Sequence, residues 1–270
     1  MAFKLAFSTL GCPNWTIEQV GEAARRYGYD GIEVRLLDGE LLPPDLDAAG
    51  RQRIKRALRG LAIPSVDTSA RFAYPDADER AKNRKMAEQF LDVANDLEAP
   101  MIRVFGGNLA EGQTLEQARD LIADSLNQLA PAAERCGVKI VLETHDAMSA
   151  GKTVAEVLAK VPSRSIGALW DSHHPYRMGE TVEQTWELIG QRTLHTHVKD
   201  ARRQGEGWQL VPLGEGEVPV KEMLATLHRH GWSGWVAVEW EKKWYPELAD
   251  ADEAMPQHMD VLRRYIQGLG

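Results

Sequence analysis

The chain has 270 residues, of which 43% are hydrophobic and 27% are charged, and its formal net charge at pH 7 is −8. This composition is typical of a globular protein with a sizeable core, and it argues against a disordered chain. The negative charge argues against a protein that binds nucleic acid nonspecifically, because such binding needs a concentrated positive field.

The cysteines and the amino-terminal sequence indicate in which cellular compartment the protein is expected. The two cysteines, Cys12 and Cys136, have no paired spacing, which argues against a disulfide framework and a cysteine zinc site. Polar residues return at Ser8 and Thr9, so the start lacks the long apolar core of a signal peptide. No apolar run reaches the roughly 20 residues that span a bilayer. We therefore expect a cytoplasmic protein.

The first half of the chain alternates between short apolar strands and amphipathic helices. Gly28 and Gly60 mark the ends of the first two helices. The third strand is expected to end before the polar residues Asp67 and Thr68. The predicted strands are 4–9, 31–35, 62–66 and 101–105, and the predicted helices are 17–27, 48–59, 76–97 and 115–136.

The second half continues the same alternation after a buried strand that begins at Val138. A polar, glycine-rich excursion at 202–216 interrupts it, and this segment could close over a site or remain a static loop. The predicted strands are 138–143, 166–170, 193–197 and 235–238, and the predicted helices are 153–160, 181–188, 220–230 and 251–266.

These strand-then-helix units number eight, and no change of composition marks a linker between domains. Such alternation implies parallel strands joined by right-handed crossovers, and eight units allow the sheet to close on itself. We predict a single α/β domain over 1–270 with the (β/α)8 TIM barrel fold. An open doubly wound sheet is the competing architecture, but the first strand lacks the Gly-x-Gly-x-x-Gly turn of a dinucleotide site.

Four strands of the second half end in the ionisable residues Glu143, Asp171, His197 and Glu239. The steps between them are 28 residues (143 to 171), 26 (171 to 197) and 42 (197 to 239). One β/α unit averages about 30 residues, so the first two steps fit consecutive strands, and the third includes the excursion. Because the carboxyl ends of parallel strands share one edge, we expect the four side chains to meet there.

This oxygen-rich set suits Mn²⁺, Mg²⁺ or Co²⁺, and Zn²⁺ also fits it. A single polar strand end often does no more than cap a helix. Four of them, each directly after a buried strand, favour a metal site.

Several motifs of the chain resemble those of the sugar phosphate isomerase/epimerase superfamily, whose members have the xylose-isomerase-like TIM barrel. The resemblance covers nearly the whole chain and is specific for the superfamily, though not for a substrate. The motifs are Tyr29-Asp-Gly-Ile-Glu33, Ile102-Arg-Val-Phe-Gly-Gly107, Leu142-Glu-Thr-His145, Trp170-Asp-Ser-His-His174, His195-Thr-His-Val-Lys-Asp200, Gly214-Glu-Gly-Glu217 and Val238-Glu-Trp-Glu241.

The resemblance implies that Glu143, Asp171, His197 and Glu239 bind one divalent metal ion, with Mn²⁺ the first expectation, and that His174 contacts the substrate. Members of the superfamily move protons between adjacent carbons of a metal-chelated hydroxy-ketone. We therefore expect an isomerase or epimerase of carbohydrate metabolism that acts on a sugar or sugar phosphate through a metal-stabilised enediolate. Our hypothesis is that Glu143 and Glu239 also serve as the catalytic base and acid.

Four further residues are candidates for substrate binding: Lys199, Glu33, Arg103 and His145. Lys199 could instead pair with Asp200, and a buried ion pair between strands would explain Glu33 and Arg103 equally well. His145 could orient a metal ligand through its other ring nitrogen. His195 shares the face of His197 one layer deeper, so we expect it in the interior.

Three other functions compete with isomerisation. A DNA-repair endonuclease of the same superfamily would need histidines on early strands, and this chain has none before His145. An inosose-type dehydratase would begin with the same enediolate and then expel a hydroxyl group. A non-catalytic barrel that binds metal or sugar would look similar in sequence. We expect a small carbohydrate as partner, no nucleic acid and no membrane, and no sequence signature identifies a homo-oligomer interface.

Overall fold

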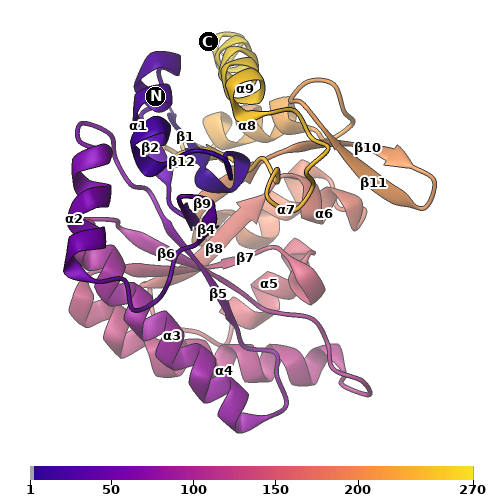
Figure 1. Cartoon of the computed structure of the whole chain (residues 1–270). Helices are drawn as coiled ribbons and strands as arrows, with labels where there is room; N and C mark the ends of the chain where they lie inside the picture. Colours follow the sequence, from indigo (N-terminus) through magenta and orange to yellow (C-terminus); the bar gives the residue numbers. More distant parts are fainter. Residues whose placement is uncertain (1–2, 270) are drawn as a thin grey trace.

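The computed structural model describes residues 3–269, and its centre is one sheet of eight parallel strands surrounded by helices (Figure 1). The order of the strands in the sheet is β2-β1-β12-β9-β8-β7-β6-β5. These strands are β1 (Lys4–Ser8), β2 (Gly31–Glu33), β5 (Val66–Arg71), β6 (Met101–Phe105), β7 (Lys139–Glu143), β8 (Ile166–Asp171), β9 (Thr193–Val198) and β12 (Trp235–Val238).

The sheet curls so that its two ends meet. Isolated parallel bridges from Gly31 to Ala62 and from Val34 to Val66 join the β2 side to the β5 side. Within the sheet, β1 pairs with β12, so the first and the last strands of the chain are neighbours. The predicted (β/α)8 TIM barrel is therefore confirmed.

Helices follow the strands on the outside of the barrel, and the long helices α3 and α4 lie side by side (Figure 1). Thr16, Thr114 and Thr181 each cap a helix through a reciprocal bond with a glutamine three residues on. The main helices are α1 (Ile17–Tyr27), α2 (Ala48–Ala57), α3 (Ala77–Asp96), α4 (Leu115–Cys136), α5 (Gly151–Leu158), α6 (His173–Arg177), α7 (Val182–Ile189), α8 (Val220–Arg229) and α9 (Ala251–Gln267). Within residues 3–269, none combines the length and the hydrophobicity of a membrane span.

The prediction of the third strand is wrong in position. It was expected at 62–66, whereas β5 spans Val66–Arg71. Pro64 lacks a backbone N–H and interrupts the earlier segment, in which Ala62 makes only an isolated bridge. The polar residues Asp67 and Thr68 instead form the strand and are buried in it. A hydrophobicity pattern alone does not detect a strand whose polar side chains are buried by partners across the barrel.

Three features of the fold were not predicted. The excursion at 202–216 contains an antiparallel hairpin of β10 (Asp200–Gln204) and β11 (Gly207–Val211). It projects from the barrel (Figure 1). The short helix α6 begins directly after β8, where Asp171 Oδ1 accepts the backbone N–H groups of His173 and His174 at 2.8 and 3.0 Å. A small two-stranded pair, β3 (Leu36–Leu37) and β4 (Glu40–Leu41), follows β2.

The core has two parts because successive side chains of a strand point to opposite faces. The larger part packs the helices against the outside of the sheet. The smaller part fills the barrel interior and contains Met101, Val141 and Leu169. On β7, Val141 therefore lies below Glu143 on the interior face, and an apolar layer separates the polar end of the barrel from the other end.

The buried His258 on α9 should make folding stability pH-dependent. Its Nδ1 accepts the backbone N–H of Leu213 at 3.3 Å, and burial lowers the pKa of His258 to about 3. Because its pKa in the unfolded chain is about 6.5, this residue contributes stability above about pH 6.5, and the contribution falls by about 1.4 kcal/mol per unit as pH decreases toward 3. The test is urea unfolding of the wild type and of His258→Asn, which keeps a hydrogen-bond acceptor. Below pH 6.5, the free energy of unfolding should fall less steeply with decreasing pH in the variant than in the wild type. Equal slopes would contradict this assignment.

Candidate metal centre

Four side chains from four strands meet at the carboxyl end of the barrel. Glu143 ends β7, Asp171 ends β8, His197 lies near the end of β9, and Glu239 follows β12. Each offers one ligand atom, and these atoms lie within 4.8 Å of one another. His197 Nδ1 is 3.2 Å from Glu143 Oε1 and 3.4 Å from Glu239 Oε1. All four residues are buried. The structure thus brings the predicted ligands together.

The donor set fits a divalent ion. Neighbouring ligands about 2.1 Å from an ion lie roughly 3.0 to 3.4 Å apart at octahedral or tetrahedral angles, which matches the two distances from Nδ1. Within residues 3–269, one oxygen of each carboxylate makes no hydrogen bond: Glu143 Oε2, Asp171 Oδ2 and Glu239 Oε2. These oxygens form ion pairs with Arg103 and Lys199. Three buried carboxylates need further positive charge, which a metal would supply.

Lys199 is the cation nearest to the cluster. Its Nζ lies 3.3 Å from Asp171 Oδ2 and 2.5 Å from Glu241 Oε1, and it also pairs with Glu239. Burial alone would lower the pKa of Lys199, but Asp171, Glu239 and Glu241 raise it well above its ordinary value. The ammonium group is therefore charged, and sequence analysis missed its contact with Glu241.

The alternative pairing of Lys199 with Asp200 is not observed. Lys199 follows His195 and His197 at a spacing of two residues, so all three share the interior face of the barrel. Asp200 points the other way, where its carboxylate accepts the backbone N–H groups of Gly214, Gly216 and Val218 at 2.9 to 3.1 Å. Asp200 thus anchors the loop after β11.

Arg103 lies beneath Glu143 and forms buried ion pairs. Its Nη2 is 3.3 Å from Asp67 Oδ2, and its Nε is 3.4 Å from Glu143 Oε2. The guanidinium also lies over the Phe105 ring, 3.9 Å from the centroid. Burial and the charge of Glu33 raise the pKa of Asp67 to about 8, against the opposing effect of Arg103. The ion-pair explanation of Arg103 therefore describes its contacts, and substrate binding by it stays a prediction.

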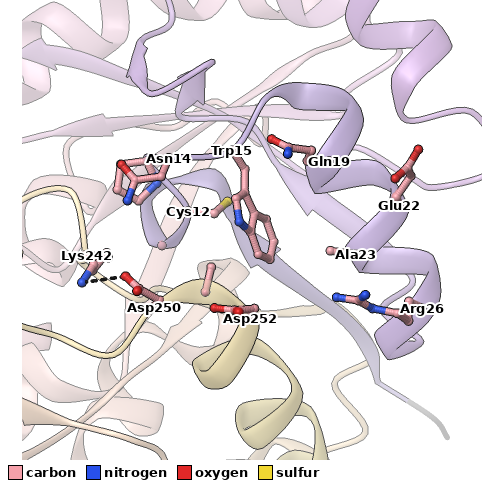
Figure 2. Close-up of a pocket in the computed structure, with 13 residues that line it drawn as sticks. Cys12, Asn14, Trp15, Gln19, Glu22, Ala23, Arg26, Lys242, Asp250 and Asp252 are labelled. Carbon is pink, nitrogen blue, oxygen red and sulfur yellow. Dashed lines mark ion pairs between the residues drawn. The ribbon is translucent and has the colours of Figure 1, made fainter.

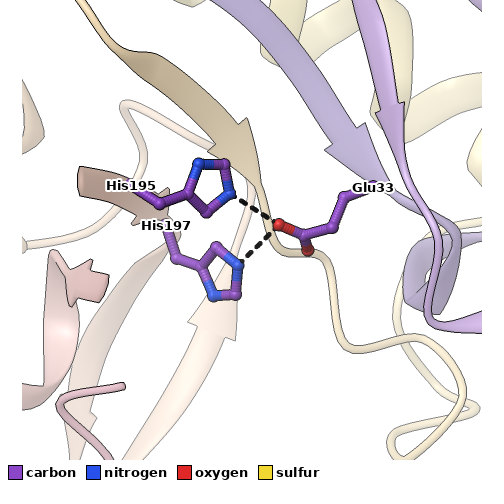
Figure 3. A group of neighbouring side chains, drawn as sticks. All are labelled: Glu33, His195 and His197. Atoms are coloured by element: carbon purple, nitrogen blue, oxygen red, sulfur yellow. Dashed lines mark hydrogen bonds and ion pairs between the residues drawn. The ribbon is translucent and has the colours of Figure 1, made fainter. Parts of the chain in front are cut away.

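Glu33 contacts the opposite ring nitrogen of His197 from the one near Glu143 and Glu239. Its Oε2 is 2.9 Å from His197 Nε2 and 2.7 Å from His195 Nε2, and all three residues are buried (Figure 3). Burial alone would raise the pKa of Glu33, but the two imidazoles hold it well below its ordinary value. The carboxylate is therefore ionised and contacts histidines rather than the open cavity above.

A cavity of about 620 Å³ opens beside the cluster, between the β10–β11 hairpin and the loop after Glu241. We call it the vestibule. Its inner end is formed by His145 and His174, whose ring centroids are 4.6 Å apart, and its outer wall includes Trp208 and Tyr245. Neither ring nitrogen of His174 has a hydrogen-bond partner within residues 3–269, so both can serve a bound molecule.

His145, at the inner end of the vestibule, contacts the carboxylate of Asp146. Its Nδ1 is 3.0 Å from Asp146 Oδ1, and its ring packs on Phe105 with centroids 4.7 Å apart. Burial opposes protonation, but the contact with Asp146 raises the pKa of His145 above its ordinary value. This arrangement places a partly exposed, readily protonated imidazole beside the cluster.

A second cavity, of about 500 Å³, lies between the segment 11–15 and one side of α1 and the N-terminal end of α9. Figure 2 shows the Trp15 indole within it, and Lys242 paired with Asp250 at 3.0 Å along its edge. None of the four predicted metal ligands lines either cavity. The vestibule is the better candidate site, because its lining residue His174 lies 3.9 Å from Asp171 and its lining residue Glu241 pairs with Lys199.

Fold and site together define a (β/α)8 barrel with a buried cluster of three carboxylates and a histidine at the carboxyl ends of its strands. The family of xylose isomerase-like TIM barrels matches residues 22–265 of the sequence. The chain belongs to this family.

Individual proteins that are similar to this chain indicate which kinds of enzyme are among its relatives. The fructoselysine 3-epimerase of Escherichia coli O157:H7 is 25% identical and aligns with 87% of this chain and 90% of its own length. The inosose dehydratase of Histophilus somni is 26% identical over 84% of this chain and 83% of its own. The solved structure of the IOLI protein with a bound zinc atom has a TM-score of 0.85 at 20% identity and covers 99% of both chains. Relatives of this chain are thus sugar epimerases and inosose-processing enzymes.

Proposed function

We propose that this protein is a divalent-metal-dependent enzyme that isomerises or epimerises a sugar or sugar phosphate bearing a ketone. The observation that carries the proposal is the cluster itself: carboxylate oxygens of Glu143 and Glu239 lie 3.2 and 3.4 Å from His197 Nδ1. Epimerases and inosose isomerases among the relatives support the same class of reaction. We place the enzyme in cytoplasmic carbohydrate metabolism.

Glu143, Asp171, His197 and Glu239 would hold the ion, with Mn²⁺ the first metal to test and Zn²⁺ the second. When bound, the ion would supply a Lewis acid that stabilises negative charge developing on the substrate carbonyl. Glu143 and Glu239 come from β7 and from the end of β12, so their carboxylates approach the cluster from different strands. One would remove the proton from the carbon beside the carbonyl, and the other would return a proton to complete the transfer.

Deuterium exchange tests this proposal directly. The metal-loaded protein is incubated in D₂O with ketoses, ketose phosphates, inososes and a fructosyl-amine conjugate, Mn²⁺ is then removed, and ¹H NMR spectra are recorded. We expect metal-dependent deuterium uptake at the carbon next to the carbonyl of at least one compound. No exchange with any compound, in a protein shown to bind metal, would favour a barrel that binds without turnover.

An inosose-type dehydratase is the second candidate, because dehydratases are among the relatives. Dehydration begins with removal of the same proton and then expels a neighbouring hydroxyl group as water. The NMR experiment separates the two reactions, since an isomer or epimer keeps every oxygen and a dehydrated product gains a double bond.

Trp208 should contribute to substrate binding rather than to proton transfer. Its ring packs on His173 with centroids 5.1 Å apart, on the wall of the vestibule. Aromatic rings at such positions supply apolar contact area to ligands. We expect Trp208→Ala to raise KM about 10-fold, a loss of about 1.4 kcal/mol, with little change in kcat. Steady-state kinetics on the active substrate checks this, and a fall in kcat with constant KM would contradict it.

A further inference from the structure

We propose that Glu33 is a positioning residue that fixes the tautomer and ring orientation of His197, so that His197 presents a bare Nδ1 to the metal. The inference rests on the metal site proposed above. Glu33 would not be a metal ligand and would not touch the substrate. Its effect would reach the ion through the imidazole ring alone.

The two nitrogens of His197 face opposite partners. Nδ1 lies 3.2 and 3.4 Å from the carboxylates of Glu143 and Glu239, on the side of the cluster. Nε2 lies 2.9 Å from Glu33 Oε2, on the side of the barrel interior. A neutral imidazole carries one proton, and a metal binds the nitrogen that lacks it. An ionised carboxylate only accepts hydrogen bonds, so Glu33 stabilises the proton on Nε2 and leaves Nδ1 free for metal.

The same three residues could be considered a second metal site, because Glu33, His195 and His197 offer atoms close enough to share an ion. The distances favour hydrogen bonds instead. Glu33 Oε2 is 2.7 and 2.9 Å from the two Nε2 atoms, within the range of N–H···O hydrogen bonds. Atoms that bind one ion at about 2.1 Å lie roughly 3.0 Å apart or more. The Nε2 atoms of both rings point at one oxygen in Figure 3.

His195 contacts the same carboxylate oxygen of Glu33. It lies two residues before His197 on β9 and donates to the same Oε2 from one layer deeper. Glu33 reaches these rings across the barrel interior, since β2 and β9 are separated by β1 and β12 in the sheet. The register that pairs Glu33 with Ser8 sets the height of its carboxylate in the barrel. A shorter side chain at position 33 would not span this distance.

Metal titration of Glu33→Gln tests the proposal. Glutamine keeps the size of the side chain but loses the charge and brings an N–H₂ donor toward His197. Substitution of such a partner typically weakens metal affinity about 10–100-fold, and we expect a loss of that size while the stoichiometry stays at one ion per chain. Co²⁺ absorption titration gives both quantities, and thermal melting of the metal-free protein checks that the variant is folded. The matched control is His195→Gln, which removes the other histidine contact of Glu33 but keeps both Glu33 and His197, and it should lose less affinity than Glu33→Gln.

Several results would overturn the proposal. Unchanged affinity in Glu33→Gln, or equal losses in the two variants, would show that Glu33 does not act through His197. Loss of a second bound Co²⁺ would show that Glu33 belongs to a separate ion site. ¹⁵N-histidine NMR of Zn²⁺-loaded wild type decides the question without any variant, because a proton on Nδ1 of His197 would refute it. A wild type that binds no ion would instead refute the proposed function.

Discussion

Glu143→Gln and Glu239→Gln should each lower turnover about 10²–10⁴-fold, the usual contribution of a general acid or base. Glutamine keeps the shape of glutamate and one oxygen that can bind metal, but it cannot accept a proton at neutral pH. Both carboxylates lie within 3.4 Å of His197 Nδ1, so each would be close to a substrate held at the cluster. The measurements are kcat with saturating Mn²⁺ and the deuterium exchange rate of the same variants.

The variant Asp171→Asn distinguishes the loss of a metal ligand from the loss of a catalytic acid or base. Asp171 belongs to the cluster, but its Oδ1 accepts the backbone N–H groups at the start of α6, and its Oδ2 faces Lys199. We expect this variant to bind metal more weakly and to regain part of its activity at high Mn²⁺, unlike the two glutamine variants. Near-normal turnover in Glu143→Gln and in Glu239→Gln, with metal bound, would refute the assigned roles.

Lys199→Met should destabilise the metal-free protein by about 3–5 kcal/mol, because it leaves buried carboxylates without their positive partner. Lys199 is itself buried and contacts Asp171, Glu239 and Glu241. A bound divalent ion would supply part of the missing charge, so the loss should be smaller in the metal-loaded protein. Urea unfolding with a chelator and with excess Mn²⁺ measures both values.

Lys199→Arg is the control for this prediction, since it keeps the positive charge but replaces the ammonium group with a planar guanidinium group. It should lose less stability than Lys199→Met in the chelated protein. If Lys199→Met and Lys199→Arg lower the free energy of unfolding by the same amount, packing rather than charge explains the effect. If metal does not reduce the loss in Lys199→Met, the ion does not share the carboxylates that Lys199 neutralises.

The sequence could predict the fold and the position of the cluster because both depend on local patterns. Glu143 directly follows an apolar run, and so does Asp171, and the ends of parallel strands meet once the barrel closes. Alternation along β9 also predicts that His195 and His197 lie on one face of the strand. The roles of these residues as ligands and catalysts stay predictions.

What the sequence could not predict depends on contacts across the barrel. Nothing near Glu33 in the chain indicates that its carboxylate meets two histidines more than 160 residues away. Burial of Asp67 in β5 depends on Arg103 and other interior side chains, so its polar segment resembled a loop. The contact between Lys199 and Glu241 likewise joins a residue between β9 and β10 to the loop after β12.

The pairing of β1 with β12 determines when the cluster can exist during synthesis. Glu239 directly follows β12, and β12 inserts between β9 and the first strand of the chain. A ribosome adds about 5–20 residues per second, so β1 waits on the order of 10 to 45 s for its last neighbour. Until then the predicted ligand set lacks Glu239. The complete four-ligand site can therefore form only after β12 has been synthesised and has paired with β1 and β9.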